Sequence, residues 1–349
     1  MPYMRNVIFT AARDLFPGYF ALVMATGIVS IACELLGLHW VAVPLVVVSW
    51  LGYIVLWALT LLRIIRYRRQ LFDDLIDHQR SPGFFTVVAA TCVLGAQSLV
   101  IDDLGGVAAA LWVFGLGLWC AVMYGFFTAI IVHARETTLA KGINGAWLNA
   151  VVATQSVVVL KGVLDASSTP STAVQFLCLV FFMVGCMLYL AFIPLIFYRL
   201  VFARMDYSDF APSYWINMGA VAITTLAGSI LILQGGSWPV LAQFMPFLTG
   251  FTLFFWAVAT WWIPLLVALA AWRYIWREER VKYEPQLWSM VFPLGMYTVG
   301  TDFLSRALHL PFLTRISDAF VYIALAAWTA VFVGLVHRLM TRARAASRR

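Results

Sequence analysis

The sequence predicts an all-α integral membrane protein whose ten transmembrane helices form five helical-hairpin repeats. Of its 349 residues, 63% are hydrophobic and only 11% are charged, too little charge to cover a soluble domain of this length. The apolar residues are gathered in blocks long enough to cross the hydrocarbon core of a bilayer. Alternate blocks also open with similar residues, which indicates an internal repeat.

The apolar blocks follow one another closely, so residues 1–349 are expected to form a single membrane domain. Each block is continuously apolar and does not alternate with a period of two, which excludes a transmembrane β-barrel. The first block has no small-residue cleavage site after it and is interpreted as a retained helix. The ten blocks are residues 16–37, 41–62, 83–101, 107–132, 147–164, 174–200, 213–233, 242–272, 287–304 and 316–338.

Positive charge is distributed unevenly between the predicted loops. Of the 23 lysines and arginines, all except Lys161, Arg306 and Arg315 lie before the first block, after the even-numbered blocks or in the C-terminal tail. The positive-inside rule therefore predicts a multi-pass protein of the plasma (inner) membrane with both termini in the cytoplasm. Because this asymmetry accounts for the pI of about 9.3, the basic character does not indicate nucleic-acid binding. A basic cytoplasmic face would also attract anions.

The repeat is carried by the openings of the odd-numbered blocks. A proline, or an asparagine in the third repeat, is followed three positions later by an aromatic residue. Proline suits the first turn of a helix, asparagine suits the N-cap, and aromatic rings favour the membrane interface. The openings are PGYF from Pro17, PGFF from Pro82, NGAW from Asn144, PSYW from Pro212 and PQLW from Pro285. The repeats are predicted at approximately residues 14–68, 81–137, 144–205, 211–280 and 285–342.

Odd and even helices differ in composition. The even helices are apolar and rich in tryptophan, whereas the odd helices carry small and mildly polar residues that suit a close helix contact or a water-filled lumen. We therefore expect the odd helices to form an inner ring around a pore and the even helices an outer ring facing lipid. Tight packing without a passage is the alternative. The candidate pore-lining residues are Thr26, Gly27, Thr91, Gly95, Thr154, Gln155, Thr224, Thr225, Gly295 and Thr298.

Charged residues are rare within the predicted inner helices. Lys161, Asp302 and Glu34 lie near their outer ends and are interpreted as outer-mouth charges, so a carboxylate-lined path for cations is disfavoured. The five cysteines contain no C-x-x-C pair, and the five histidines form no ligand pair of known spacing. We therefore expect no metal and no cofactor.

Three segments resemble the tellurite-resistance/dicarboxylate transporter family: PGYFALVMATGIVSIA, YWINMGAVAITTLAG and LWSMVFPLG. This family contains the bacterial TehA proteins, the plant slow anion channels, fungal malate permeases and sulfite efflux pumps. The resemblance covers nearly the whole chain. It implies five hairpins with the odd helices lining a central pore, commonly in a homotrimer. It also implies that a phenylalanine of the ninth helix, followed by proline, occludes the pore, and the matching residues are Phe292 and Pro293.

The predicted function is passage of small anions through a central pore gated by this aromatic plug. A proton-coupled transporter or exporter of C4-dicarboxylates or sulfite is the alternative, with Glu34 and Asp302 as the first coupling candidates. A membrane-embedded redox subunit would need paired histidine ligands, which the sequence lacks. An enzymatic activity is therefore not expected.

Overall fold

The computed structural model describes residues 2–133, 137–167, 171–204, 210–235, 239–276 and 282–347. Five of the arginines that predict the orientation lie outside these residues: Arg135, Arg277, Arg280, Arg348 and Arg349. Within the described ranges the regular structure is helical, without a strand. The predicted class, an all-α membrane protein, is confirmed.

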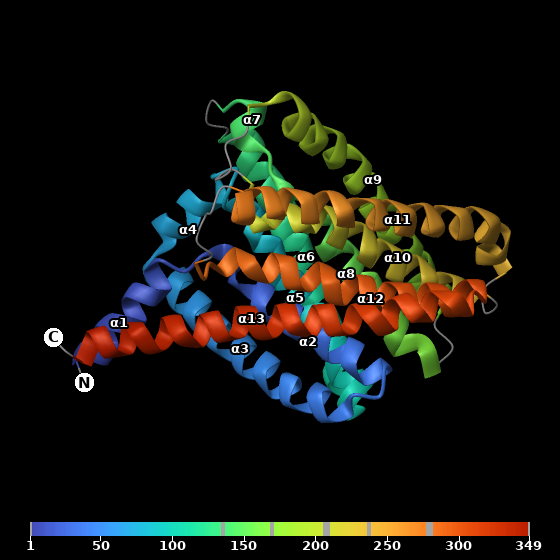
Figure 1. Ribbon diagram of the computed structural model, residues 1–349, viewed down its shortest axis with the longest axis horizontal. Coiled ribbons are helices and arrows are strands. Elements are labelled where there is room, and N and C mark those ends of the chain that lie inside the picture. The colour runs from blue at the N-terminus through green and yellow to red at the C-terminus, as the bar shows by residue number, and fades with distance from the viewer. Residues whose placement is uncertain are drawn as a thin grey trace.

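Each predicted block coincides with one long helix. We call the five helices of the odd blocks inner helices: α2 (Ala21–Leu35), α5 (Phe85–Asp102), α8 (Asn149–Leu164), α10 (Ile216–Gln234) and α12 (Trp288–Leu308). The outer helices are α3 (His39–Arg66), α6 (Gly105–Val132), α9 (Thr172–Phe202), α11 (Pro239–Ala271) and α13 (Thr314–Ser347). Short helices α1 (Pro2–Arg13), α4 (Arg68–Leu75) and α7 (Leu139–Gly142) lie toward one end of the bundle (Figure 1).

Among the described residues, nine helical segments are long and apolar enough to cross a membrane. They correspond to all of the predicted spans except the ninth, which is α12. Polar groups lower the hydropathy of this helix, because it contains several hydroxyl residues and both Asp302 and Arg306. The number of ten spans therefore stays a prediction.

The inner helices form a closed ring. In order, α2 packs against α5, α5 against α8, α8 against α10, α10 against α12, and α12 again against α2. Each outer helix packs on the inner helix that precedes it in the chain. In the most apolar stretches, 78–94% of the residues of α2, α5, α8 and α10 are buried, against 22–50% in the outer helices. Figure 1 shows α11, α12 and α13 running lengthwise across the bundle.

Hydrogen bonds join the hairpins, and bonds of one form recur at four of the five junctions that the described residues form. At each of these junctions an aromatic side chain of an outer helix meets a threonine hydroxyl of the following inner helix. The pairs are Tyr53 with Thr91 (2.8 Å), Trp119 with Thr154 (2.9 Å), Trp256 with Thr301 (3.0 Å) and Trp328 with Thr26 (3.0 Å). The last of these bonds links the fifth hairpin to the first and so closes the ring.

Every inner helix begins with a 3₁₀ turn, and the five turns form a ring of their own. The turns are η1 (Pro17–Phe20), η2 (Ser81–Phe84), η3 (Gly145–Leu148), η6 (Pro212–Trp215) and η9 (Pro285–Leu287), and each contacts its two neighbours. Glycine permits the close approach of neighbouring turns, because a Cβ atom on Gly83 would lie 2.7 Å from the backbone nitrogen of Gly18. In the third repeat the Asn144 side chain accepts a hydrogen bond from the Ala146 N–H (2.8 Å), as expected for an N-cap.

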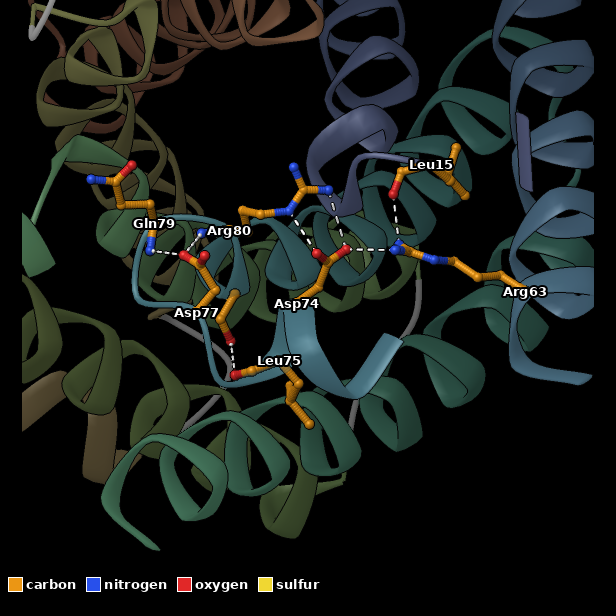
Figure 2. A network of polar contacts seen from close by, with 8 residues as sticks. Leu15, Arg63, Asp74, Leu75, Asp77, Gln79 and Arg80 are labelled. Atoms are coloured by element: carbon orange, nitrogen blue, oxygen red, sulfur yellow. Dashed lines mark hydrogen bonds and ion pairs between the residues drawn. The ribbon is translucent and has the colours of Figure 1, made fainter. Parts of the chain in front are cut away.

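Four arginines anchor this ring of turns from the ends of the outer-helix segments. In each case a guanidinium Nη1 donates to the carbonyl of the residue two positions before a 3₁₀ turn. The pairs are Arg63 with Leu15, Arg199 with Ile143, Arg273 with Phe210 and Arg338 with Tyr283. Figure 2 shows the first, where Asp74 also pairs with Arg63 (2.7 Å) and Arg80 (2.6 Å).

Candidate functional site

A cavity occupies the C-terminal half of the inner ring. All five inner helices contribute to its wall, which consists almost entirely of aliphatic side chains with Met296 and Phe303. Cys92 and Ser156 are the exceptions. We call it the apolar cavity. An ion entering it would find few groups to replace its hydration shell.

A second cavity lies at the opposite end, where the inner helices begin. We call it the polar cavity. Its wall contains residues of all five 3₁₀ turns or their caps together with side chains from the neighbouring segments: Phe16, Gly18, Gln79, Gly83, Thr86, Asn144, Ala146, Asn149, Arg199, Ala211, Ser213, Gln286 and Ser289. Arg199 is the one charged residue among these lining residues, and none of the described residues in the wall is an aspartate or a glutamate.

Phe292 lies between the two cavities on one face of α12. Ser289 lines the polar cavity, whereas Met296 and Val299 line the apolar cavity. Phe292 follows Ser289 by three residues and precedes Met296 by four, and this spacing puts all three on the same side of an α-helix. The Phe292 side chain is fully buried. It therefore stands in the closed section of the ring that separates the polar cavity from the apolar cavity.

The closed section is short. Ser289 and Met296 are seven positions apart, which corresponds to about 10 Å along the helix axis. Ala89 of α5 and Ala220 of α10 each lie three residues before a residue that lines the apolar cavity, and Met24 of α2 lies four residues before another. Phe292 has the largest of these four side chains.

Pro293 and two glycines fix the position of α12 at the same level. Proline has no N–H, so the Ser289 carbonyl lacks its usual helical partner beside the polar cavity. A Cβ atom on Gly219 of α10 would lie 2.7 Å from Pro293 Cγ. On the other side, a Cβ atom on Gly295 would lie 2.9 Å from Ile28 Cγ2 of α2. These contacts hold α12 closely between its two inner neighbours.

None of the ten predicted pore-lining residues is in the wall of either cavity. Thr26, Thr91 and Thr154 instead make the inter-hairpin hydrogen bonds described above. The three glycines lie at helix contacts, where Gly27 faces Val93, Gly95 faces Leu160 and Gly295 faces Ile28. Gln155 donates a hydrogen bond to the Phe182 carbonyl of α9. Thr224, Thr225 and Thr298 donate to carbonyls one turn earlier in their own helices. Small and polar character in these helices thus serves packing.

The predicted outer-mouth charges are at the C-terminal ends of the inner helices, and each has an ion-pair partner. Lys161 pairs with Asp165, and Asp302 pairs with Arg306 (2.6 Å). Glu34 Oε2 accepts a hydrogen bond from His39 Nδ1 (2.7 Å). In the part of the chain that the structure describes, no group of three or more His, Cys, Asp and Glu residues is arranged to hold a metal ion.

Arg199 and Asn149 were not predicted as site residues. From the sequence, Arg199 was only one of the basic residues that predict the orientation of the chain in the membrane. Asn149 lies within a predicted apolar block. A signal was nonetheless present, because Arg63, Arg199 and Arg338 recur near the ends of even blocks and are followed by no acidic residue within three positions. Recognising it would have required knowing which of these arginines reaches the lumen.

Comparisons with known proteins agree with this architecture. Residues 14–336 match the SLAC1 family, described as voltage-dependent anion channels. The chain is 40% identical over 152 residues to an uncharacterised membrane protein of Mycobacterium tuberculosis, covering 44% of this chain and 77% of that protein. It is 23% identical to an uncharacterised transporter of Methanocaldococcus jannaschii, covering 94% of each chain. It is also 23% identical to the sulfite efflux pump SSU1 of Trichophyton rubrum, covering 95% of this chain and 92% of that protein.

These matches confirm the resemblance stated from the sequence motifs, because the family consists of anion channels and two of the relatives are described as a transporter and an efflux pump. They also agree with the prediction that the protein is not an enzyme. A multi-pass bundle of apolar helices, with a cavity at each end of its inner ring, fits such a role. The chain belongs to the SLAC1 family of voltage-dependent anion channels.

Proposed function

We propose that this protein passes small anions through the centre of its inner ring, from the polar cavity past Phe292 into the apolar cavity. Phe292 is the plug, and Pro293 sets its position. The observation that carries the proposal is the spacing along α12, where Phe292 lies on one helical face between Ser289 of the polar cavity and Met296 of the apolar cavity. A fully buried aromatic ring there blocks ions sterically and by excluding water.

Electrostatics support an anion as the permeant species. Five inner helices begin at the polar cavity, and the N-terminal end of each carries a partial positive charge. Arg199 adds a full positive charge to the wall. By the distribution of lysine and arginine this end faces the cytoplasm of a plasma (inner) membrane, which would enrich anions at the entrance. A homotrimer is the assembly that the family resemblance implies.

A coupled exporter of sulfite or C4-dicarboxylates is the second candidate. It is supported by the similarity to a sulfite efflux pump over nearly the whole length of both chains. Coupling to protons would need a titratable group in the transport path, and Glu34 and Asp302 are two of the acids at the end of the inner ring where the anion would leave.

Flux measurements on purified protein in liposomes test both candidates. Chloride, nitrate, sulfite and malate are each loaded at known gradients, with the membrane voltage clamped by valinomycin and potassium. A channel lets each anion move only down its own electrochemical gradient, whatever the pH difference. Accumulation of an anion against that gradient when a pH difference is imposed would identify a coupled carrier instead. Absence of flux for all four anions, in the wild type and in Phe292→Ala, would contradict both candidates.

A further inference from the structure

The first turns of three inner helices present backbone N–H groups at the wall of the polar cavity. Its wall includes the second residue of three 3₁₀ turns: Gly18, Ser213 and Gln286. In each turn the preceding residue is proline, which has no N–H, and the first backbone hydrogen bond of the turn is made by the following residue. The N–H groups of these three residues therefore precede the first helical bond. Their turns continue into inner helices of 15 or more residues.

Arg199 supplies the charge that an anion would need. Its side chain is 8% exposed and comes from the outer helix α9. Nη1 donates to the Ile143 carbonyl, and this bond uses one of the five N–H groups of the guanidinium. The bond also holds the planar group at the cavity wall. A guanidinium fixed in this way can donate two parallel hydrogen bonds to neighbouring oxygen atoms of one ligand.

Asn149 is a second, independent sign of a ligand. The residue is 3% exposed and lines the same cavity, yet its Oδ1 atom makes no hydrogen bond among the described residues. A buried amide oxygen without a partner costs free energy, so this side chain is expected to bind a ligand or water. Because the two ends of an amide have nearly the same shape, Asn149 can turn its NH₂ group toward an anion.

We propose that the polar cavity is a binding site for a small oxyanion, with Arg199 as the residue that selects oxyanions over halides. The site rests on the proposed function, because it names the class of anion that the pore would receive first. An oxyanion presents two or more acceptor atoms to the guanidinium fork and to the backbone N–H groups, whereas a halide presents one. Arg199 therefore distinguishes the two classes by geometry and attracts both by charge.

The repeat provides a matched control for Arg199. Arg273 is equally buried, at 8% exposed, and donates in the same way to the Phe210 carbonyl ahead of the next 3₁₀ turn. It does not line the polar cavity. Replacing either arginine by glutamine removes an anchor of the ring of turns, but only replacement of Arg199 removes a positive charge from the cavity wall.

The test measures binding and transport separately. Nitrate, sulfite and chloride are titrated calorimetrically into the detergent-purified wild type, Arg199→Gln, Arg199→Lys and Arg273→Gln. We expect Arg199→Gln to weaken binding of nitrate and sulfite about tenfold or more, and chloride binding clearly less. Arg199→Lys should recover part of the affinity because the charge remains and the fork is lost. In planar bilayers, the oxyanion concentration that gives half-maximal conductance, on the side of the polar cavity, should rise in parallel for Arg199→Gln. For Arg273→Gln both the affinity and this concentration should stay within twofold of wild type.

Equal losses in Arg199→Gln and Arg273→Gln would mean that Arg199 has only an anchoring role, and would overturn the proposal. Unchanged oxyanion affinity in Arg199→Gln would do the same. Should Arg199→Gln not fold, Asn149→Leu and Arg199→Lys decide in its place, because both should still lower oxyanion affinity if the site exists. Oxyanion binding that depends on Arg199 in a protein without anion flux would support the binding site and contradict the permeation function.

Discussion

Replacing Phe292 by alanine should open the central passage. The closed section between Ser289 and Met296 is about 10 Å long, and Ala89 and Ala220 lie near its level on two other helices. Truncating the ring at Cβ removes a large side chain from this section and should join the polar cavity to the apolar cavity. We expect anion conductance in planar bilayers to rise at least tenfold, which corresponds to a barrier lowered by about 1.4 kcal/mol.

A graded series strengthens the measurement. Conductance should increase in the order Phe292, Leu, Val, Ala as the side chain shortens, because a hydrophobic constriction admits ions once it is wide enough to hold water. The same substitution also removes packing. A buried phenylalanine replaced by alanine typically costs about 3–5 kcal/mol of stability. Lower thermal stability by itself is thus not evidence that the pore has opened.

Phe255→Ala separates the two effects. Phe255 is equally buried but lies on the outer helix α11, where its ring packs against Tyr189 and Phe251. Its truncation should lower stability by a similar amount and leave conductance unchanged. If Phe292→Ala conducted no better than the wild type, or if Phe255→Ala conducted equally well, the assignment of Phe292 as the plug would be wrong.

Two further substitutions test the surrounding structure. Asp74→Asn removes the carboxylate that neutralises Arg63, whose side chain is 3% exposed. The substitution should lower the free energy of unfolding by about 3–5 kcal/mol in a thermal or denaturant assay. Asp73→Asn, at an exposed position, is the control and should lower it by under ~0.5 kcal/mol. Similar losses for the two would contradict a buried ion pair. Trp328→Phe removes the donor to Thr26 and should lower stability by only about 0.6 kcal/mol while anion conductance stays the same. A large change in conductance would instead indicate that Thr26 faces the lumen.

The helices and their division into two classes could be predicted because hydropathy and the recurring openings report them directly. Span length and the placement of proline and glycine are local properties of the sequence. Glycine at the second position of PGYF and PGFF now has a tertiary reason, because Gly18 and Gly83 lie at a backbone contact between neighbouring turns. The recurring openings therefore reflect, in part, the contacts between neighbouring turns in the ring, which the sequence alone does not show.

The wall of the lumen could not be predicted from composition. Small and hydroxyl residues were expected to line the pore. A threonine hydroxyl, however, can donate a hydrogen bond to the backbone carbonyl one turn earlier in its own helix, and the same hydroxyl can accept one from a tryptophan of an outer helix. Conversely, aliphatic residues such as Val299 and Leu226 line the apolar cavity. Which side of a helix faces the centre depends on its rotation, and a helix buried on nearly every side has no polar face to reveal it.

Phe292 was identified differently. Its role was expected only because a Phe-Pro pair matched a family motif, since a phenylalanine in a membrane helix is ordinarily a packing residue. The positions of Ser289 and Met296 supply an argument that does not depend on the resemblance. Arg199 had no such motif, and its distinction from Arg273 appears only in three dimensions.

The bond from Trp328 to Thr26 spans 302 positions of the chain, yet it has the same form as the bonds between consecutive hairpins. The order in which the hairpins are connected is therefore incidental to the finished assembly. A circularly permuted gene, with the old ends joined by a linker and new ends opened at another junction, should encode the same bundle. Because α1 and the start of the inner ring lie at the end of the molecule where α13 finishes (Figure 1), such a linker would not have to cross the membrane.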